Sequence, residues 1–334
     1  MAMAFATVVS VPWLRAFFAL TPLPHAVWLL IAVTALAAGI VMRRIAISAN
    51  QSGPSLHQAR FPPFKKNLVV RLLDPSHHGF LFPLMAALLI LGSAWLFLGV
   101  LEDVVAHDPL VDVDVMVHDT LQKRRTPPMD GAMVAMTEIG DVQVILPIIL
   151  AALAWFVWHR LWQTSLYWLA VIGLAEILVK VLKFTLHRPR PLSTLVYDGV
   201  ESFSFPSSHA TMSVVVYGFL AFLICRKQRA AIRNLIAVSA AMVIALILLS
   251  RLYLGAQWAS DVIAGMSFGL AWIGALAVAY HYRTDEDTKP KQLFVLLSLT
   301  LLLSGVRHLT QDHGRDLLHY ALLPEVERDR IKWR

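Results

Sequence analysis

The stretch Phe205-Pro206-Ser207-Ser208-His209-Ala210-Thr211 joins a polar loop to a run of apolar residues. Proline is poorly tolerated inside a helix and serine is favoured at a helix N-terminus, so we expect a helix to begin here. The first N–H groups of a helix lack internal partners and lie at the positive end of its dipole, where a phosphate group binds well. His209 falls in the first turn and can face such an anion. Alone, this pattern is equally typical of a serine-capped membrane helix with an interfacial histidine.

Two further groups of residues flank this stretch. Lys183 is followed after six residues by Arg190-Pro191, and Ser250-Arg251 is followed by Asp261 ten residues past the arginine. Together with Pro206-Ser207-Ser208-His209, these residues resemble the signature of the type 2 phosphatidic acid phosphatase superfamily, which includes the vanadium haloperoxidases. That signature reads K-x6-R-P, P-S-G-H and S-R-x5-H-x3-D.

The resemblance implies a role for each matching residue. The phosphate-binding set would be Lys183, Arg190, Ser207, Ser208 and Arg251, with Ser208 at the position of the signature glycine. Guanidinium groups grip two phosphate oxygens at once, lysine supplies a point charge, and the backbone N–H groups of the two serines would add neutral donors. His209 would be the general acid that protonates the leaving oxygen, and Asp261 would orient and charge the nucleophilic residue.

Gln257 stands where the signature has its nucleophilic histidine. The lone pair of an amide nitrogen is delocalised into the carbonyl, so this side chain cannot attack phosphorus, although it can hydrogen-bond to a phosphate oxygen or donate to Asp261. A helix that includes both positions would place Gln257 and Asp261 on one face. Three explanations stay open: an exchange made to trap a substrate, a natural non-catalytic member, or replacement of the nucleophile by water activated at His209 or by His187.

Composition indicates a multi-span membrane protein. The chain has 334 residues, of which 57% are hydrophobic and 15% charged, and its mean hydropathy is +0.63. Its single cysteine, Cys225, excludes an intramolecular disulfide and is expected to pack in an apolar run. The net charge of +7 does not predict a nucleic-acid partner, because the basic residues flank apolar spans as orientation signals do.

We predict an all-α integral membrane protein with a six-span phosphatase-type core and one extra span on each side. The eight predicted spans cover residues 25–42, 80–101, 142–159, 164–186, 207–225, 235–249, 258–280 and 293–306. Residues 1–79 would form an N-terminal span and a basic cytoplasmic linker, with an interfacial segment rather than a signal peptide at 1–24. Residues 80–284 would form the core, and residues 285–334 a C-terminal span and polar tail.

Charge sets the orientation of these spans. Residues 43–79 and 226–234 are basic, whereas residues 102–141 contain nine acidic residues and three basic ones. The positive-inside rule places the basic segments in the cytoplasm, so all three parts of the signature converge on the outer side. We therefore expect a bacterial inner-membrane protein with its site facing the periplasm. Within the acidic segment, residues 111–115 alternate like a strand, but the family resemblance favours short surface helices there.

The resulting hypothesis is a membrane phosphatase acting on a lipid phosphate or pyrophosphate, such as phosphatidic acid, phosphatidylglycerol phosphate or undecaprenyl pyrophosphate. The alternative is a non-catalytic module on the same fold that binds a phospholipid or a protein partner. A transporter would rest on Glu176 and Lys180 alone, which an i, i+4 ion pair explains as well. We expect no cofactor and no metal, because the remaining histidines are scattered without a carboxylate or cysteine at ligand spacing.

Overall fold

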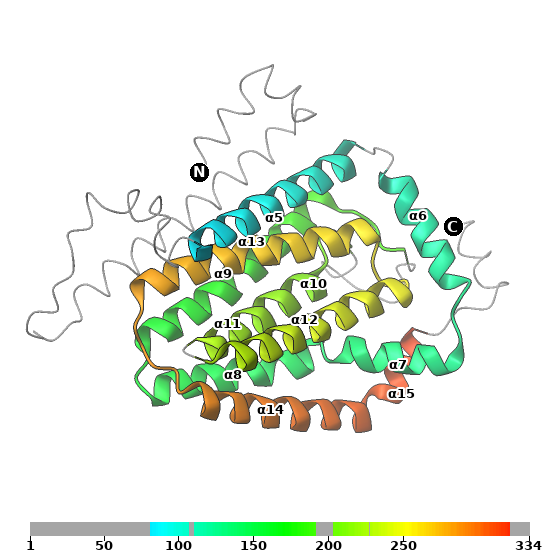
Figure 1. Cartoon of the computed structure of the whole chain (residues 1–334). Coiled ribbons are helices and arrows are strands. Elements are labelled where there is room, and N and C mark those ends of the chain that lie inside the picture. Colours follow the sequence, from blue (N-terminus) through cyan, green and yellow to red (C-terminus); the bar gives the residue numbers. More distant parts are fainter. Residues whose placement is uncertain (1–80, 107–109, 192–202, 227, 321–334) are drawn as a thin grey trace, which may run out of the picture.

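The computed structural model describes residues 81–106, 110–191, 203–226 and 228–320, and these residues form a bundle of helices (Figure 1). The elements, in chain order, are α5 (Leu81–Ala106), α6 (Leu110–Gln122), α7 (Pro127–Glu138), α8 (Val142–Trp158), α9 (Trp162–Leu186), α10 (Ser208–Ser213), the π-helical turn η2 (Val214–Gly218), α11 (Phe219–Cys225), α12 (Ala230–Tyr253), α13 (Ala259–Arg283), α14 (Pro290–Gln311) and α15 (His313–His319). The predicted all-α fold class is confirmed.

Within the described residues, six helical stretches are long and apolar enough to cross a membrane. They are Leu84–Ala106, Pro127–Trp158, Ser208–Cys225, Ala230–Tyr253, Ala259–Arg283 and Pro290–Gln311. Helix α9 coincides with the span predicted at 164–186 but is not among the six, and it carries the charged residues Glu176, Lys180 and Lys183. The span predicted at 25–42 and the linker after it lie outside the described residues.

The helices pack around an aromatic core. In Figure 1, α13 runs along α5, while α10, η2 and α11 form one continuous helical segment through the middle of the bundle. The ring of Trp168 stacks on that of Phe219 with 6.2 Å between centroids, and Tyr280 packs edge-on against Phe219 at 6.1 Å. Trp168 also donates its indole N–H to the carbonyl of Ile149 on α8. Burial of these large rings ties α8, α9, α11 and α13 together.

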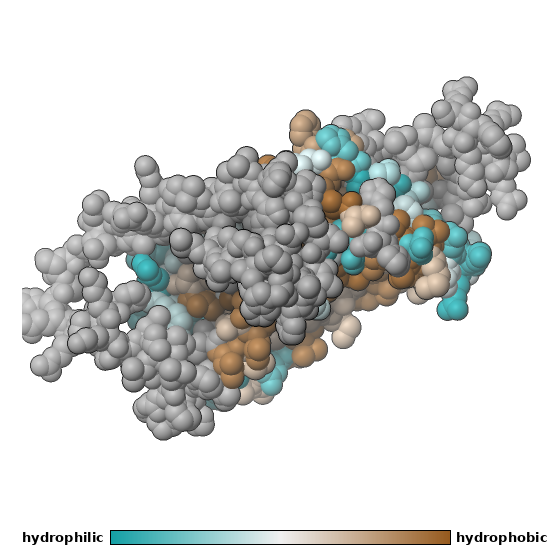
Figure 2. All heavy atoms as spheres, turned by 90° about the horizontal axis from the view of Figure 1, so that it is seen from above, coloured by the Kyte–Doolittle hydropathy of each residue, from teal (hydrophilic) through white to brown (hydrophobic). Residues whose placement is uncertain are grey.

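Large apolar side chains also cover the outside of the bundle. Leu88, Trp95 and Leu302 keep 59%, 64% and 60% of their surface exposed, and many others on the spanning helices resemble them. Figure 2 shows hydrophobic side chains over much of the described surface that is visible from this side, together with groups of hydrophilic ones. An apolar exterior of this kind suits contact with lipid rather than water.

The three parts of the signature meet at one end of the bundle, which we call the signature end. Here α9 ends, α10 begins, α12 ends and α13 begins, and α6, α7 and α15 lie over the same end (Figure 1). Residues 111–115, which alternate like a strand, lie within α6, so the helical prediction for this segment is confirmed. The link between α11 and α12 lies at the opposite end, where Arg226 donates to the carbonyl of Thr284 just after α13.

Candidate active site

The helix predicted after Pro206 begins at Ser208, with Ser207 as its N-cap. The hydroxyl oxygen of Ser207 accepts a hydrogen bond from the N–H of Ala210 at 3.3 Å. Its own N–H, predicted to hold phosphate, instead donates to the carbonyl of Asp261 at 3.1 Å. This bond joins the second part of the signature to the third. The helix N-terminus with the N–H groups of Ser208 and His209 remains suited to an anion.

Gly265 allows α13 to approach this turn closely. A Cβ atom at this position would lie 2.6 Å from the carbonyl oxygen of Ser207 and 3.0 Å from the Cβ of Ala210. The hydroxyl of Thr211 spans the same contact, because it lies 3.0 Å from the carbonyl oxygen of Ser207 and 3.2 Å from that of Gly265. The two helices that carry His209 and Asp261 are therefore held against each other by backbone contact.

The first part of the signature follows a sharp turn at the end of α9. His187 adopts a left-handed conformation with φ of 50°, which ends the helix and redirects the chain. Lys183 is fully buried and donates from Nζ to the carbonyl of Phe203 at 2.8 Å. Arg190 donates from Nη1 to the carbonyl of Ala256 at 3.0 Å. These bonds hold the loop after α9 against the segments before α10 and α13.

The side chain of Gln257 is buried beside Arg190. With its amide turned so that both ends are satisfied, the oxygen accepts from Nη1 of Arg190 and the nitrogen donates to the carbonyl of Ser204 at 2.9 Å. The condition for a helix face shared by Gln257 and Asp261 is not met, because α13 begins only at Ala259, with Trp258 as its N-cap. The Gln257 amide therefore faces Arg190 rather than Asp261.

Asp261 is held by other groups. Its Oδ1 accepts from Arg188 at 2.6 Å, and its Oδ2 accepts from the N–H of Trp258 at 3.2 Å. Arg188 also donates to Asp114 of α6 at 2.6 Å, and Asp114 accepts from the N–H of Ser260 at 2.8 Å. Sequence analysis missed Arg188 and Asp114. Arg188 lies inside the six-residue spacer of the first motif, where the signature specifies no residue type.

His209 is paired with a carboxylate that the signature does not include. Its Nε2 lies 2.6 Å from Oδ1 of Asp141, the residue that precedes α8. Both side chains are about one quarter exposed, at 24% and 25%, so the pair is reachable from water. A carboxylate in this position fixes the orientation of the imidazole ring.

Arg251 is fully buried and reaches the C-terminal helix. Its Nη1 donates to the hydroxyl oxygens of Thr137 on α7 at 2.9 Å and of Tyr320 at 2.8 Å. Its guanidinium carbon also lies 5.7 Å from the centroid of the Tyr320 ring. Tyr320 follows α15, so a residue outside the signature accepts a hydrogen bond from the signature arginine Arg251.

The residues behind two open alternatives, His187 on the one hand and Glu176 with Lys180 on the other, have ordinary structural surroundings. His187 packs against the rings of Phe184 and Phe203, with centroids 5.5 and 4.5 Å away. Glu176 and Lys180 form an ion pair at 3.2 Å with 35% and 59% of their side chains exposed, as the i, i+4 interpretation predicts. Neither arrangement favours a nucleophile at His187 or a transport pathway along α9.

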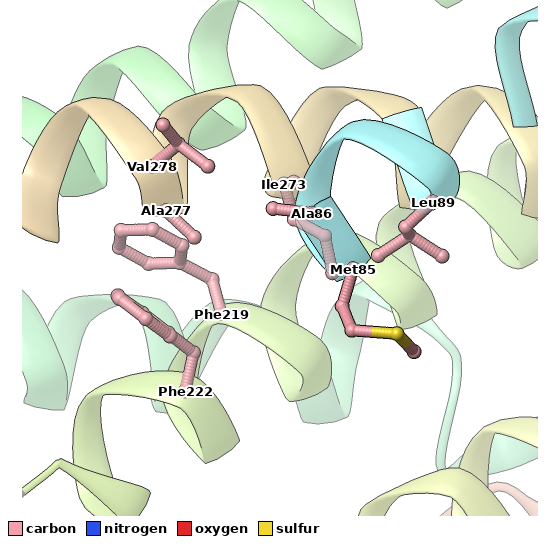
Figure 3. A pocket seen from close by; sticks show the side chains of 9 residues that line it. Met85, Ala86, Leu89, Phe219, Phe222, Ile273, Ala277 and Val278 are labelled. Atoms are coloured by element: carbon pink, nitrogen blue, oxygen red, sulfur yellow. The ribbon is translucent and has the colours of Figure 1, made fainter. Parts of the chain in front are cut away.

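An apolar pocket of about 380 Å³ lies at a distance from these polar groups along the bundle (Figure 3). It is lined by Met85, Ala86, Leu89, Phe219, Phe222, Ile273, Gly274, Ala277 and Val278. These residues come from the start of α5, from α11 and from the second half of α13, whereas the signature end contains the start of α13. A pocket without polar lining atoms does not suit a phosphate group.

The signature end therefore brings together a histidine–carboxylate pair, the buried or partly buried cations Lys183, Arg190 and Arg251, and a helix N-terminus. Residues 164–285 match the PAP2 superfamily. This part of the chain resembles the membrane lipid phosphatases of that superfamily.

Two relatives support this assignment. Phosphatidylglycerophosphatase B of Bacillus subtilis (strain 168) is 29% identical over 181 residues, which are 53% of this chain and 88% of the relative. The crystal structure of the first transmembrane PAP2 type phosphatidylglycerolphosphate phosphatase from Bacillus subtilis aligns with a TM-score of 0.51 and 27% identity. That alignment covers 58% of this chain and 98% of the solved one.

Proposed function

We propose that this chain binds the phosphate group of a phosphorylated membrane lipid at its signature end and lacks only the nucleophile needed to hydrolyse it quickly. Phosphatidylglycerol phosphate is the first candidate lipid, because both relatives are named for phosphatases of that lipid. Phosphatidic acid and undecaprenyl pyrophosphate are the next candidates, since they present the same charged group on an apolar tail.

The cations of the site support phosphate binding. Lys183, Arg190 and Arg251 come from three different segments whose ends meet at the signature end. A phosphate monoester carries close to two negative charges at neutral pH, and cations in partly dehydrated surroundings stabilise it strongly. The apolar outer faces of the neighbouring helices suit the acyl chains of the same lipid.

The observation that carries the proposal is the position of the Gln257 amide. Its oxygen accepts from Arg190, which supports the inference that position 257 and this arginine would contact the same phosphate group. An amide in that place can donate to a phosphate oxygen but cannot form a phosphorus–nitrogen bond. His209 with Asp141 remains in position to protonate a leaving oxygen.

Charge supports an outward-facing site. The chain is an integral membrane protein, and we place it in a bacterial inner membrane with the signature end toward the periplasm. The basic link between α11 and α12 lies at the opposite end, and cytoplasmic loops carry the excess of lysine and arginine. We assign residues 80–284 to the phosphatase-type core and residues 1–79 and 285–334 to flanking segments.

Phosphate release from a panel of lipid phosphates tests this proposal. The purified protein in detergent, with EDTA present, is compared with Gln257→His on phosphatidylglycerol phosphate, phosphatidic acid and undecaprenyl pyrophosphate. We expect release by Gln257→His to exceed that of the unchanged chain by at least about a hundredfold on the correct lipid, because a covalent nucleophile is restored. Adding His209→Ala to Gln257→His should remove most of this gain.

Binding is measured in parallel by titrating each lipid phosphate against the thermal stability of the unchanged chain. A lipid that is bound should raise the midpoint of unfolding, and the same lipid without its phosphate should not. Equal release by the unchanged chain and Gln257→His would show that the inferred nucleophile position is wrong. Absence of both binding and release would favour a partner-binding module on the phosphatase fold.

A further inference from the structure

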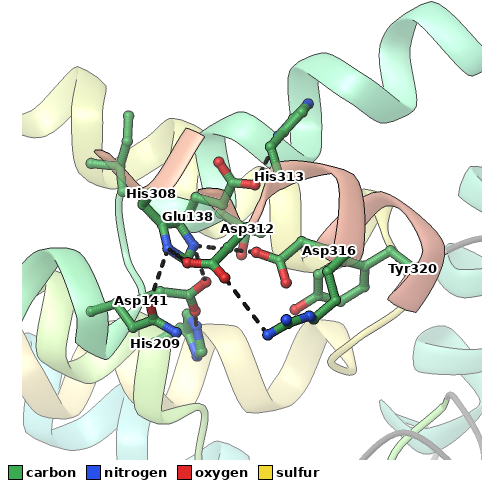
Figure 4. A network of polar contacts seen from close by, with 12 residues as sticks. Glu138, Asp141, His209, His308, Asp312, His313, Asp316 and Tyr320 are labelled. Carbon is green, nitrogen blue, oxygen red and sulfur yellow. Dashed lines mark hydrogen bonds and ion pairs between the residues drawn. The ribbon is translucent and has the colours of Figure 1, made fainter. Parts of the chain in front are cut away.

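Beside the Asp141–His209 pair lies a second group of ionisable side chains that the phosphatase chemistry does not use. Glu138 ends α7, His308 lies near the end of α14, and Asp316 lies on α15. One potential ligand atom from each lies within 4.8 Å of the other two. Figure 4 shows these side chains directed toward one another from three helices. Glu138 and His308 are buried, with 2% and 4% of their surface exposed.

Glu138 is oriented with one oxygen unused. Its Oε1 lies 2.8 Å from Nδ1 of His313, which accounts for that oxygen. Its Oε2 is buried and has no hydrogen-bond partner among the residues that the structure describes. A buried carboxylate oxygen without a partner is costly, and a bound cation is one of the few groups that would satisfy it.

His308 has the orientation of a metal-binding histidine. Its Nδ1 lies 3.2 Å from the amide oxygen of Gln143 and 3.3 Å from Oδ2 of Asp312, so the ring proton belongs on that nitrogen. The lone pair of Nε2 then faces Oδ2 of Asp316 at 3.2 Å, without hydrogen-bond geometry to any described residue. Metal-binding histidines usually donate the other ring N–H to an oxygen in this way.

The distances fit two ligands of one ion. Oxygen and imidazole ligands lie about 2.0–2.2 Å from Zn²⁺, so two ligand atoms of the same ion are separated by roughly 3–4 Å. The separation of 3.2 Å between Nε2 of His308 and Oδ2 of Asp316 lies in that range. The ligand atom that Glu138 offers lies within 4.8 Å of the other two.

The charge around the group also favours a cation. The carboxylates of Asp141 and Asp312 lie 3.8 and 3.3 Å from the two nitrogens of His308, in addition to Glu138 and Asp316. A divalent ion would offset the repulsion among these carboxylates.

We propose that Glu138, His308 and Asp316 bind a divalent transition-metal ion of the Zn²⁺ or Mn²⁺ class. One imidazole and two carboxylates form a mixed nitrogen and oxygen set, which suits these ions better than Mg²⁺ or Ca²⁺, whose ligands are oxygen atoms. Bound there, the ion would join α7, α14 and α15 beside the Asp141–His209 pair. The site lies outside residues 164–285, and it does not depend on the function proposed above.

The sequence contains a carboxylate spacing that the prediction of no metal leaves out. His308, Asp312 and Asp316 follow one another at intervals of four residues, so this histidine does have carboxylates at ligand spacing on helices. Glu138 could not be assigned to this group from sequence, because it lies far away along the chain and joins through packing of α7 against α15.

Calorimetric titration of the full chain tests the site directly. The protein in detergent is stripped with EDTA, exchanged into chelator-free buffer and titrated separately with Zn²⁺, Mn²⁺ and Mg²⁺. We expect one equivalent of Zn²⁺ or Mn²⁺ to bind and Mg²⁺ to bind at least about tenfold more weakly. Saturation should raise the midpoint of thermal unfolding by several degrees, because only the folded protein holds the three ligands together.

Single substitutions identify the ligands. Glu138→Gln and His308→Ala should each weaken binding at least about tenfold, and so should Asp316→Asn, which alters a partly exposed side chain and keeps its shape. The matched control is His159→Ala, at the far end of α8, which should bind the ion as the unchanged chain does. No saturable binding, or binding that survives Asp316→Asn and Glu138→Gln, would overturn the proposal.

Discussion

Arg188 lies between two buried carboxylates that come from different helices. Its Nη1 contacts Asp261 and its Nη2 contacts Asp114, each at 2.6 Å, while the arginine side chain itself is 11% exposed. Both carboxylates are almost completely buried, so water cannot replace the arginine as their partner. The residue that the family uses to orient its nucleophile therefore depends here on an arginine two positions before the signature arginine.

Replacing this arginine should destabilise the protein strongly. Arg188→Gln would leave Asp114 and Asp261 close together without a cation, and removal of one partner from a buried ion pair costs about 3–5 kcal/mol. A lower midpoint of thermal unfolding in detergent would report this loss. Arg124→Gln is the control, since Arg124 is exposed and such changes usually stay within about 0.5 kcal/mol. Equal midpoints for the two variants would contradict the bridging role.

At the scale of single residues, sequence could predict the signature but not its supporting contacts. Lys183, Arg190, Ser207 and Asp261 stand at fixed spacings, and hydrogen bonds between their loops bring the motifs together. The other residues that contact the site do not lie at a fixed distance along the sequence from the signature residues. Asp141 lies 68 residues from His209 and Asp114 lies 74 residues from Arg188, so only the packing of helices reveals these pairs.

At the scale of helices, the contact between α10 and α13 decides the shape of the site. Gly265 lets the backbone of α13 lie directly against the turn at Ser207, and backbone atoms cannot move aside as a flexible side chain can. The relative position of His209 and Asp261 therefore depends on Gly265, which has no side chain to separate the two helices.

Gly265→Ala should separate these helices and lower stability by about 1–3 kcal/mol, because the added methyl group would overlap a carbonyl oxygen. Thermal unfolding in detergent measures the change. Gly305→Ala on α14 is the matched control, since a Cβ atom there meets nothing within 4 Å and alanine is the better helix former. A loss as large in Gly305→Ala as in Gly265→Ala would exclude the close approach as the cause.

The helices themselves were largely predictable. Apolar runs predicted the seven spans from residue 80 onward, and each coincides with a described helix, because burial in lipid requires every backbone group of a span to be hydrogen-bonded within it. The ends of some helices differ from the predicted ends because a capping residue determines where the helix begins. Helix α13 was predicted from residue 258 and begins at Ala259, since Trp258 takes the capping position. The π-helical turn η2, which interrupts the α-helix between α10 and α11, cannot be predicted from hydropathy.

At the scale of the whole molecule, one end of the bundle carries the polar chemistry and the other carries the basic link. The proposed orientation can be measured with single cysteines in a Cys225→Ser background. We expect Arg315→Cys on α15 to react with a membrane-impermeant maleimide added to intact cells, and Arg229→Cys at the start of α12 to react only after permeabilisation. The reverse pattern would place the site in the cytoplasm.

The contact between Arg251 and Tyr320 bears on how small a working piece of this protein can be. The region shared with the superfamily ends at residue 285, yet the hydroxyl that holds the second signature arginine lies 69 residues after that arginine. A chain cut at the border of the homologous region would carry a buried guanidinium stripped of this partner. The shortest fragment that keeps this contact is therefore longer than the region that matches the superfamily. Grafting the site onto another protein has to include the C-terminal helices.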